Sequence, residues 1–194
     1  MASFSDDPID VVPSGQAAVA LDTVPAWLRP RYVAAAVVAL PVVALVFARS
    51  GASGDSFVAA CVVAVLAVLS AIDIAERRLP NEIVLPAAAM VFVAQSVLAP
   101  ERTLELALAG VGAALLLLLP RLFYPAGLGM GDVKLALLLG AALGSAVLAA
   151  LFLGVVAAAA YGVFLLVRDG ASARRATIPL GPFLAFGAVA VLLL

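Results

Sequence analysis

Long apolar stretches, separated by short connections that carry most of the charged side chains, make up the greater part of this chain. A helix that crosses a bilayer needs roughly 17–25 apolar residues. The pattern predicts an all-α, polytopic integral membrane helix bundle with about seven transmembrane helices. The predicted spans are 32–49, 56–74, 82–99, 103–122, 132–144, 146–168 and 178–194. Only Gly144-Ser145 separates the short fifth stretch from the sixth, so these two could form one bent helix, and the count lies between six and eight.

The overall composition supports a membrane protein. Hydrophobic residues make up 66% of the 194 residues and charged residues 12%, against about 25% charged residues in soluble domains. So few charges cannot cover a water-facing surface of this size, and we expect the lipid bilayer to surround the chain. Residues 1–31 differ, because they are polar and acidic and contain no basic start followed by an apolar core. We predict a flexible cytoplasmic tail over 1–31, followed by one membrane-embedded domain over 32–194.

The distribution of Lys and Arg predicts the orientation, because cytoplasmic connections carry an excess of both. Nine of these residues lie in the tail and in the second, fourth and sixth connections, and two lie in the others. The nine are Arg29, Arg31, Arg77, Arg78, Arg121, Lys134, Arg168, Arg174 and Arg175, and the two are Arg49 and Arg102. The N-terminus and the even-numbered connections should therefore face the cytoplasm.

Two aspartates lie at the ends of apolar stretches on this same predicted side. Asp73 ends the second stretch, and Asp132 opens the fifth. A carboxylate at the edge of a bilayer is costly to hold and commonly has a function. Each also has an ordinary alternative, since Asp73 could pair with Arg77 four residues later and Asp132 could cap a helix N-terminus.

The residues around the two aspartates favour a shared site. Gly129 and Gly131 precede Asp132 with little steric bulk, so that another backbone can approach closely. Beyond Asp73, Pro80 should end one helix, and the Asn81 side chain should cap the N-terminus of the next.

Two carboxylates in contact can hydrolyse a peptide bond without further groups. Like charges a few ångströms apart cannot both ionise, so the pair shares one proton. The ionised member accepts a proton from water, which attacks the carbonyl, while the protonated member supports the carbonyl oxygen. This chemistry needs no metal and no cofactor, and it suits a chain that contains no histidine for Ser-His or Cys-His catalysis.

Three short segments stand out in order along the chain: Asp73 with Leu79-Pro80-Asn81, then Gly129-Met130-Gly131-Asp132-Val133-Lys134, then Ile178-Pro179-Leu180-Gly181-Pro182-Phe183-Leu184-Ala185. They resemble segments of the type IV prepilin leader peptidases, which are polytopic aspartyl membrane proteases. The first resembles the family's first catalytic segment, the second its GxGDxK signature, and the third its C-terminal Pro-x-Gly-Pro-Phe stretch. The resemblance implies that Asp73 and Asp132 are the catalytic pair. The residues that it assigns to the motifs around this pair are Gly129, Gly131, Lys134, Pro80 and Asn81.

The resemblance also implies a substrate and a location. The substrate would be a prepilin or pilin-like protein, itself a membrane helix with a short basic leader, which docks by lateral helix packing. Cleavage would occur at the cytoplasmic face of a bacterial or archaeal cytoplasmic membrane. Larger members also methylate the new N-terminus and carry paired cysteines, whereas this chain has only Cys61, so we expect a short, peptidase-only member. No nucleic-acid partner is expected, and the oligomeric state stays open.

Two other functions compete with this interpretation. A proton-coupled transporter would use membrane aspartates as relays, but both aspartates lie at one face. A structural membrane subunit would use them only as cap and ion-pair residues.

Three features away from the aspartates also carry predictions. Gly140 and Gly144 should allow another helix to approach closely, Gln95 should bond between helices, and Glu105 should act as a helix N-terminal charge.

Overall fold

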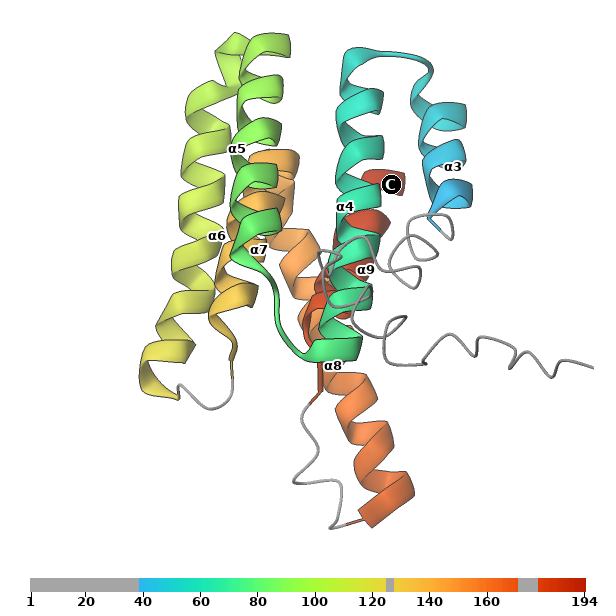
Figure 1. Ribbon diagram of the computed structural model, residues 1–194, viewed down its shortest axis with the longest axis vertical. Helices are drawn as coiled ribbons and strands as arrows, with labels where there is room; N and C mark the ends of the chain where they lie inside the picture. Colours follow the sequence, from blue (N-terminus) through green and yellow to red (C-terminus); the bar gives the residue numbers. More distant parts are fainter. Residues whose placement is uncertain (1–38, 125–127, 171–177) are drawn as a thin grey trace, which may run out of the picture.

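The computed structural model describes residues 39–124, 128–170 and 178–194, and within these ranges every regular element is helical (Figure 1). The predicted all-α class is therefore confirmed. The predicted tail over 1–31, and the first residues of the domain predicted to follow it, lie outside the described ranges. The α-helices are α3 (Leu40–Ser50), α4 (Gly54–Glu76), α5 (Asn81–Leu98), α6 (Thr103–Phe123), α7 (Met130–Leu143), α8 (Val147–Asp169) and α9 (Gly181–Leu193), with short 3₁₀ helices η2 (Pro100–Arg102) and η3 (Gly144–Ala146).

Four helical stretches in the described ranges are long and apolar enough to cross a membrane: Gly54–Glu76, Asn81–Leu98, Pro100–Phe123 and Met130–Asp169. The helices Leu40–Arg49 and Gly181–Leu193 are apolar but shorter. The protein is thus an apolar helical bundle of membrane type, and the count of seven spans stays a prediction.

The last of the four long stretches is not one straight helix. Gly144 has φ +60°, a conformation that glycine adopts without strain, and it ends α7 before the 3₁₀ turn of η3. Figure 1 shows α8 leading back from this turn, past the end at which α7 began. The chain therefore reverses at the Gly144-Ser145 connection, so the alternative of one long bent helix is wrong.

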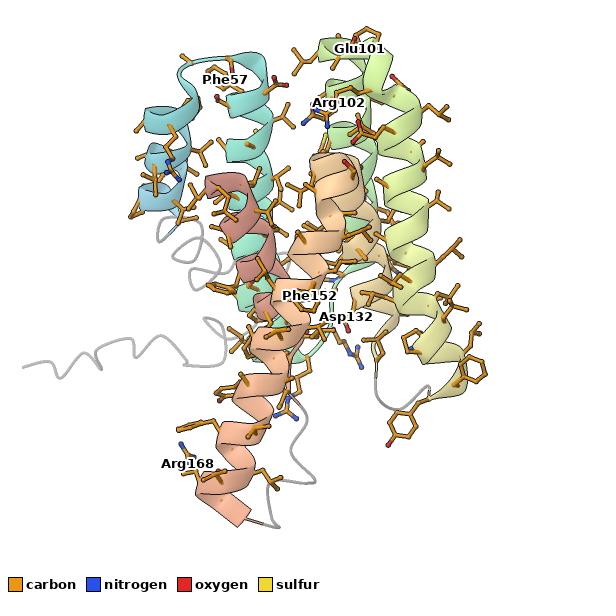
Figure 2. All side chains as sticks on the ribbon, turned by 180° about the vertical axis from the view of Figure 1, so that it is seen from behind. Phe57, Glu101, Arg102, Asp132, Phe152 and Arg168 are labelled. Carbon is orange, nitrogen blue, oxygen red and sulfur yellow. The ribbon has the colours of Figure 1, made fainter. Side chains whose placement is uncertain are left out.

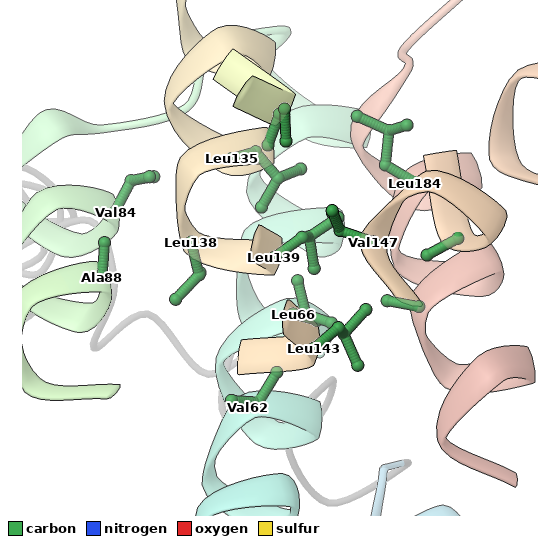
Figure 3. Packing of buried hydrophobic residues seen from close by; sticks show 14 of the residues in the cluster. Val62, Leu66, Val84, Ala88, Leu135, Leu138, Leu139, Leu143, Val147 and Leu184 are labelled. Atoms are coloured by element: carbon green, nitrogen blue, oxygen red, sulfur yellow. The ribbon is translucent and has the colours of Figure 1, made fainter. Parts of the chain in front are cut away.

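The centre of the bundle is α7. Its side chains Leu135, Leu138 and Leu139 are almost fully buried, at 1%, 0% and 0% exposure. They lie among Val62 and Leu66 of α4, Val84 and Ala88 of α5, and Leu184 of α9 (Figure 3). A helix that is apolar on every face is expected in such a position. Because α7 begins two residues before Asp132, this packing fixes that aspartate to the core.

Glycines allow the closest helix crossings. A Cβ at Gly140 would lie 2.4 Å from the Cα of Gly110, so α6 and α7 touch backbone to backbone there. A Cβ at Gly144 would lie 2.5 Å from Glu105 Oε1, again on α6. The predicted close approach at Gly140 and Gly144 is confirmed, and the helix that approaches is α6.

At the end of the bundle opposite Asp132, hydrogen bonds and an ion pair connect three helices (Figure 2). Glu105, in the first turn of α6 as predicted, accepts a hydrogen bond from the backbone N–H of Ser145 at 2.9 Å and pairs with Arg102 at 3.2 Å. Gln95 of α5 donates to the carbonyl oxygen of Ala142 at 3.4 Å, the predicted bond between helices. These contacts hold the turn between α7 and α8 to α5 and α6.

Replacing Gly140 with alanine should destabilise the bundle by about 1–3 kcal/mol, because the added methyl group must push α6 away from α7. Unfolding of the detergent-solubilised protein measures this. Gly112→Ala on α6 is the matched control, because nothing lies within 4 Å of the Cβ that it adds. Equal effects of the two substitutions would contradict the described crossing.

Candidate active site

One cavity brings the two aspartate segments together. It has a volume of about 420 Å³ and lies where α4 ends and α7 begins. We call it the aspartate cavity, and its lining residues are Asp73, Arg77, Arg78, Leu79, Asn81, Gly129, Met130, Gly131, Asp132 and Lys134. Every residue that the sequence assigned to the site lines it except Pro80, which lies in the loop directly before α5.

Asp73 lies in the last turn of α4 and is buried, with 6% of its surface exposed. Its Oδ2 accepts a hydrogen bond at 2.9 Å from the backbone N–H of Gly181, the first residue of α9. Arg77 ends α4 in the left-handed conformation, with φ 52°. Among the described residues it makes no ion pair with Asp73, so that alternative is wrong. The Asp73 carboxylate thus lies at the N-terminus of α9, where free backbone amides stabilise a negative charge.

Gly181 is a site residue that the sequence did not identify as one. A Cβ at this position would lie 2.7 Å from Oδ2 of Asp73, closer than side-chain carbon and oxygen atoms approach. Only glycine therefore lets the start of α9 reach the carboxylate. The available signal was its position in the C-terminal segment that resembles that of the leader peptidases. Nothing in the sequence pairs it with a residue 108 positions away.

Asp132 is held by its own loop. It is the third residue of α7, and its Oδ2 accepts a hydrogen bond from the backbone N–H of Gly129 at 3.1 Å. The helix starts at Met130, two residues before the predicted start, so Asp132 caps it from inside the first turn. The exposed fraction of Asp132 is 8%. The cap and the cavity are compatible, because the bond occupies only one of its two carboxylate oxygens.

Gly131 brings the two loops into contact. A Cβ there would lie 2.6 Å from the Cβ of Leu79, in the connection between α4 and α5. The prediction that another backbone approaches the two glycines is wrong, because the Leu79 side chain meets Gly131 and the Asp132 carboxylate itself lies nearest to Gly129. The contact places the start of α7 against the segment that follows Asp73.

Lys134 bridges the same two segments. Its Nζ donates to Oδ1 of Asn81 at 2.6 Å. The prediction that Asn81 caps α5 is wrong, because Asn81 is already the first helical residue and no side chain caps that helix. The carbonyl oxygen of Pro80 instead accepts the N–H groups of Ile83 and Val84, each at 3.1 Å. The Asn81 side chain is therefore available to Lys134.

The aspartate cavity combines two carboxylates with three cationic side chains, Arg77, Arg78 and Lys134. A further cation, Arg121, donates to the carbonyl oxygen of Leu128 and so anchors the segment that leads into Gly129. In the described part of the chain, no three His, Cys, Asp or Glu side chains form a group that could hold a metal ion. Two buried carboxylates beside one cavity can share a proton and activate a water molecule.

Comparison with known proteins adds an independent observation. The sequence model of the type IV leader peptidase family matches residues 60–163, more than half of the 194 residues. The matched region contains both aspartates and the whole lining of the aspartate cavity. Gly181 lies beyond it. No curated protein and no solved structure matches the chain.

Proposed function

This chain belongs to the type IV leader peptidase family, and we propose that it is an aspartyl endopeptidase that removes the short basic leader of prepilins or pilin-like proteins. The observation that carries the proposal is the single cavity lined by Asp73 and Asp132. The two residues come from different helices, and both are buried. A site built only from caps and ion pairs would not need both carboxylates to face one space.

The geometry supports a general acid–base mechanism. The amides of Gly181 and Gly129 each occupy one oxygen of Asp73 and Asp132 respectively. In the proposed mechanism, the two remaining oxygens hold one shared proton and one water molecule. The ionised carboxylate accepts a proton from water as the water oxygen bonds to the peptide carbon, and the protonated carboxylate donates its proton to the carbonyl oxygen. Collapse of the tetrahedral intermediate breaks the C–N bond, and a carboxylic acid proton passes to the leaving amine.

The charges around the cavity support cleavage at the cytoplasmic face. Arg77, Arg78 and Lys134 line the cavity, whereas Arg102 lies at the opposite end of the bundle (Figure 2). An excess of Lys and Arg marks the cytoplasmic side of a membrane protein. We place the cavity there, in the cytoplasmic membrane of a bacterium or archaeon, with the tail over 1–31 on the same side and the peptidase domain over 32–194 within the bilayer.

Co-expression tests the proposal. The chain is produced together with pilin-like proteins encoded in the same genome, each tagged at its C-terminus. We expect at least one to become shorter, and mass spectrometry should show a new N-terminus directly after the basic leader. If every such protein keeps its leader while the chain accumulates in the membrane, the proposal is wrong.

The bridge between Lys134 and Asn81 should matter for the rate. We expect Lys134→Met and Asn81→Ala each to lower kcat by about 10- to 100-fold. Without this hydrogen bond, the two loops would no longer hold the aspartates at a fixed position relative to each other. The double variant should be no slower than the slower single one, since both remove the same contact. Steady-state kinetics with a processed substrate measure this.

Two comparisons make the bridge prediction specific. Lys134→Arg keeps a donor and should retain more activity than Lys134→Met. Arg168→Met, which removes an exposed cation paired with Asp169, should leave the rate unchanged. If the fold-loss in kcat of the Lys134→Met/Asn81→Ala double variant equals the product of the two single losses, the two residues act separately.

A further inference from the structure

An apolar groove lies on the side of the bundle where α3, α4 and α9 meet. Its volume is about 510 Å³. Its lining includes small side chains of α4 (Ala67, Ser70 and Ala71), together with Phe186 of α9 and Val42 of α3. We call it the lateral groove. Ser70 is the one residue with a polar side chain among those that line it.

The lateral groove and the aspartate cavity are linked by a third pocket that borders both. Ile74 and Pro182 line the groove and also line this pocket, of about 480 Å³, which contains Tyr161 and Phe183 and which we call the aromatic pocket. The aromatic pocket in turn shares Arg77 with the aspartate cavity. Ile74 directly follows Asp73, and Pro182 directly follows the Gly181 that bonds to it. One end of the groove is therefore lined by the sequence neighbours of Asp73 and Gly181.

The α4 side of the groove has the character of a helix-packing surface. Residues 67, 70 and 71 share one face of α4 and have small side chains, and small side chains let membrane helices approach closely. The α4 residues that line the groove run from Val63 to Ile74, about 16 Å at 1.5 Å per residue. That length matches about three turns of an apolar helix, roughly half of the hydrocarbon core.

We propose that the lateral groove docks the membrane helix of the substrate, and that the aromatic pocket receives the segment between this helix and the cleaved bond. This inference rests on the proposed function and adds the surface that selects the substrate. The change in polarity fits such an occupant, because the groove is apolar and the aspartate cavity is polar, as the substrate's membrane helix is apolar and the segment that precedes it is polar. Docking within the bilayer also lets the substrate reach the aspartates without leaving the membrane.

A second apolar groove provides a matched control. It lies between α5 and α6, has a volume of about 310 Å³ and is also lined by small residues, among them Ala88, Ala107 and Gly110. It shares no lining residue with the aspartate cavity, the aromatic pocket or the lateral groove. A general affinity of this bundle for apolar helices would fill both grooves, whereas substrate docking should fill only the lateral one.

Disulfide cross-linking in membranes tests the proposal. The exposed Cys61 is first replaced by alanine, and Asp132→Asn keeps the substrate uncut. Single cysteines then replace Ala67, Ser70 or, as the control, Ala107. The probe is a tagged single-span pilin-like protein that the wild-type chain shortens, with one cysteine placed in turn along the first three turns of its membrane helix. We expect disulfides from positions 67 and 70 and none from position 107.

Other occupants of the groove give different products. A disulfide between two copies of the chain at position 67 or 70 would overturn the proposal. So would a disulfide within one chain, between position 67 or 70 and a second cysteine that replaces Ala35, if it forms instead of the disulfide to the substrate. Equal cross-linking at position 107 would also overturn it. If no probe is shortened by the wild-type chain, the proposed function itself has failed, whereas a shortened probe that never cross-links to the groove defeats only the docking surface.

Kinetics give a second readout. Ala67→Leu and Ala71→Leu should raise KM by about tenfold with little change in kcat, because a filled groove weakens docking but leaves the aspartates intact. Ala107→Leu should change neither value. A fall in kcat without a change in KM in the groove variants would show that the groove does not bind the substrate.

Discussion

Replacing either Asp73 or Asp132 with asparagine should abolish leader cleavage while the protein still inserts and accumulates in the membrane. An amide can neither accept a proton from water nor donate one to the carbonyl oxygen with the strength of a carboxyl group. We expect a loss of at least about 10²–10⁴-fold in kcat. The asparagine carbonyl can still accept the hydrogen bond from Gly181 or Gly129, so the local fold should survive.

The measurement compares substrate size and protein level in membranes from cells that produce each variant. Asp55→Asn is the control, because Asp55 lies in the first turn of α4, at the end opposite Asp73. It should process the substrate like the wild type. A variant at position 73 or 132 that still removes the leader would show that its carboxylate is not catalytic.

Replacing Gly181 with alanine should strongly lower the rate of leader cleavage. The new Cβ would lie 2.7 Å from Oδ2 of Asp73, so either the carboxylate or the start of α9 must move. A displacement of about 1 Å at a catalytic group can cost on the order of 10²-fold in rate. We expect that loss in kcat, together with a destabilisation of about 1–3 kcal/mol from the overpacked contact.

Two readouts separate these effects. Thermal unfolding of the purified variant reports the stability, and kcat at a temperature well below unfolding reports the geometry. Gly162→Ala on α8 is the control, since its Cβ would meet only Ile178 Cδ1, at an ordinary 3.4 Å. If Gly181→Ala keeps wild-type kcat, the contact between α9 and Asp73 does not position the carboxylate.

The helical class and the two aspartates could be predicted from the sequence because both depend on local patterns. Apolar stretches of membrane length specify helices regardless of their neighbours. The predicted spans, together with the Lys and Arg counts, put Asp73 and Asp132 on the same predicted side of the membrane. The reversal at Gly144 could not be decided in advance, because glycine permits both a bent helix and a turn, and its conformation with φ +60° decides between them.

The errors concern residues whose role depends on a partner distant in the sequence. Asparagine is a common N-cap residue, but Asn81 is already the first residue of α5, whereas an N-cap would precede the helix. Its side chain instead accepts a hydrogen bond from Lys134. Gly181 was given no role beyond its place in the C-terminal segment, and only the packing of α9 against α4 shows that it meets Asp73. Propensity describes one segment at a time, whereas a site is assembled from several.

The most direct test of the account compares Asp73→Asn, Asp132→Asn and the double variant in one cleavage assay with purified protein. If the two carboxylates act as one unit, each single variant should already be as slow as the double variant, because removing either member disables the pair. A single variant that cleaves measurably faster than the double variant, with losses that multiply, would show two independent groups and contradict the shared site.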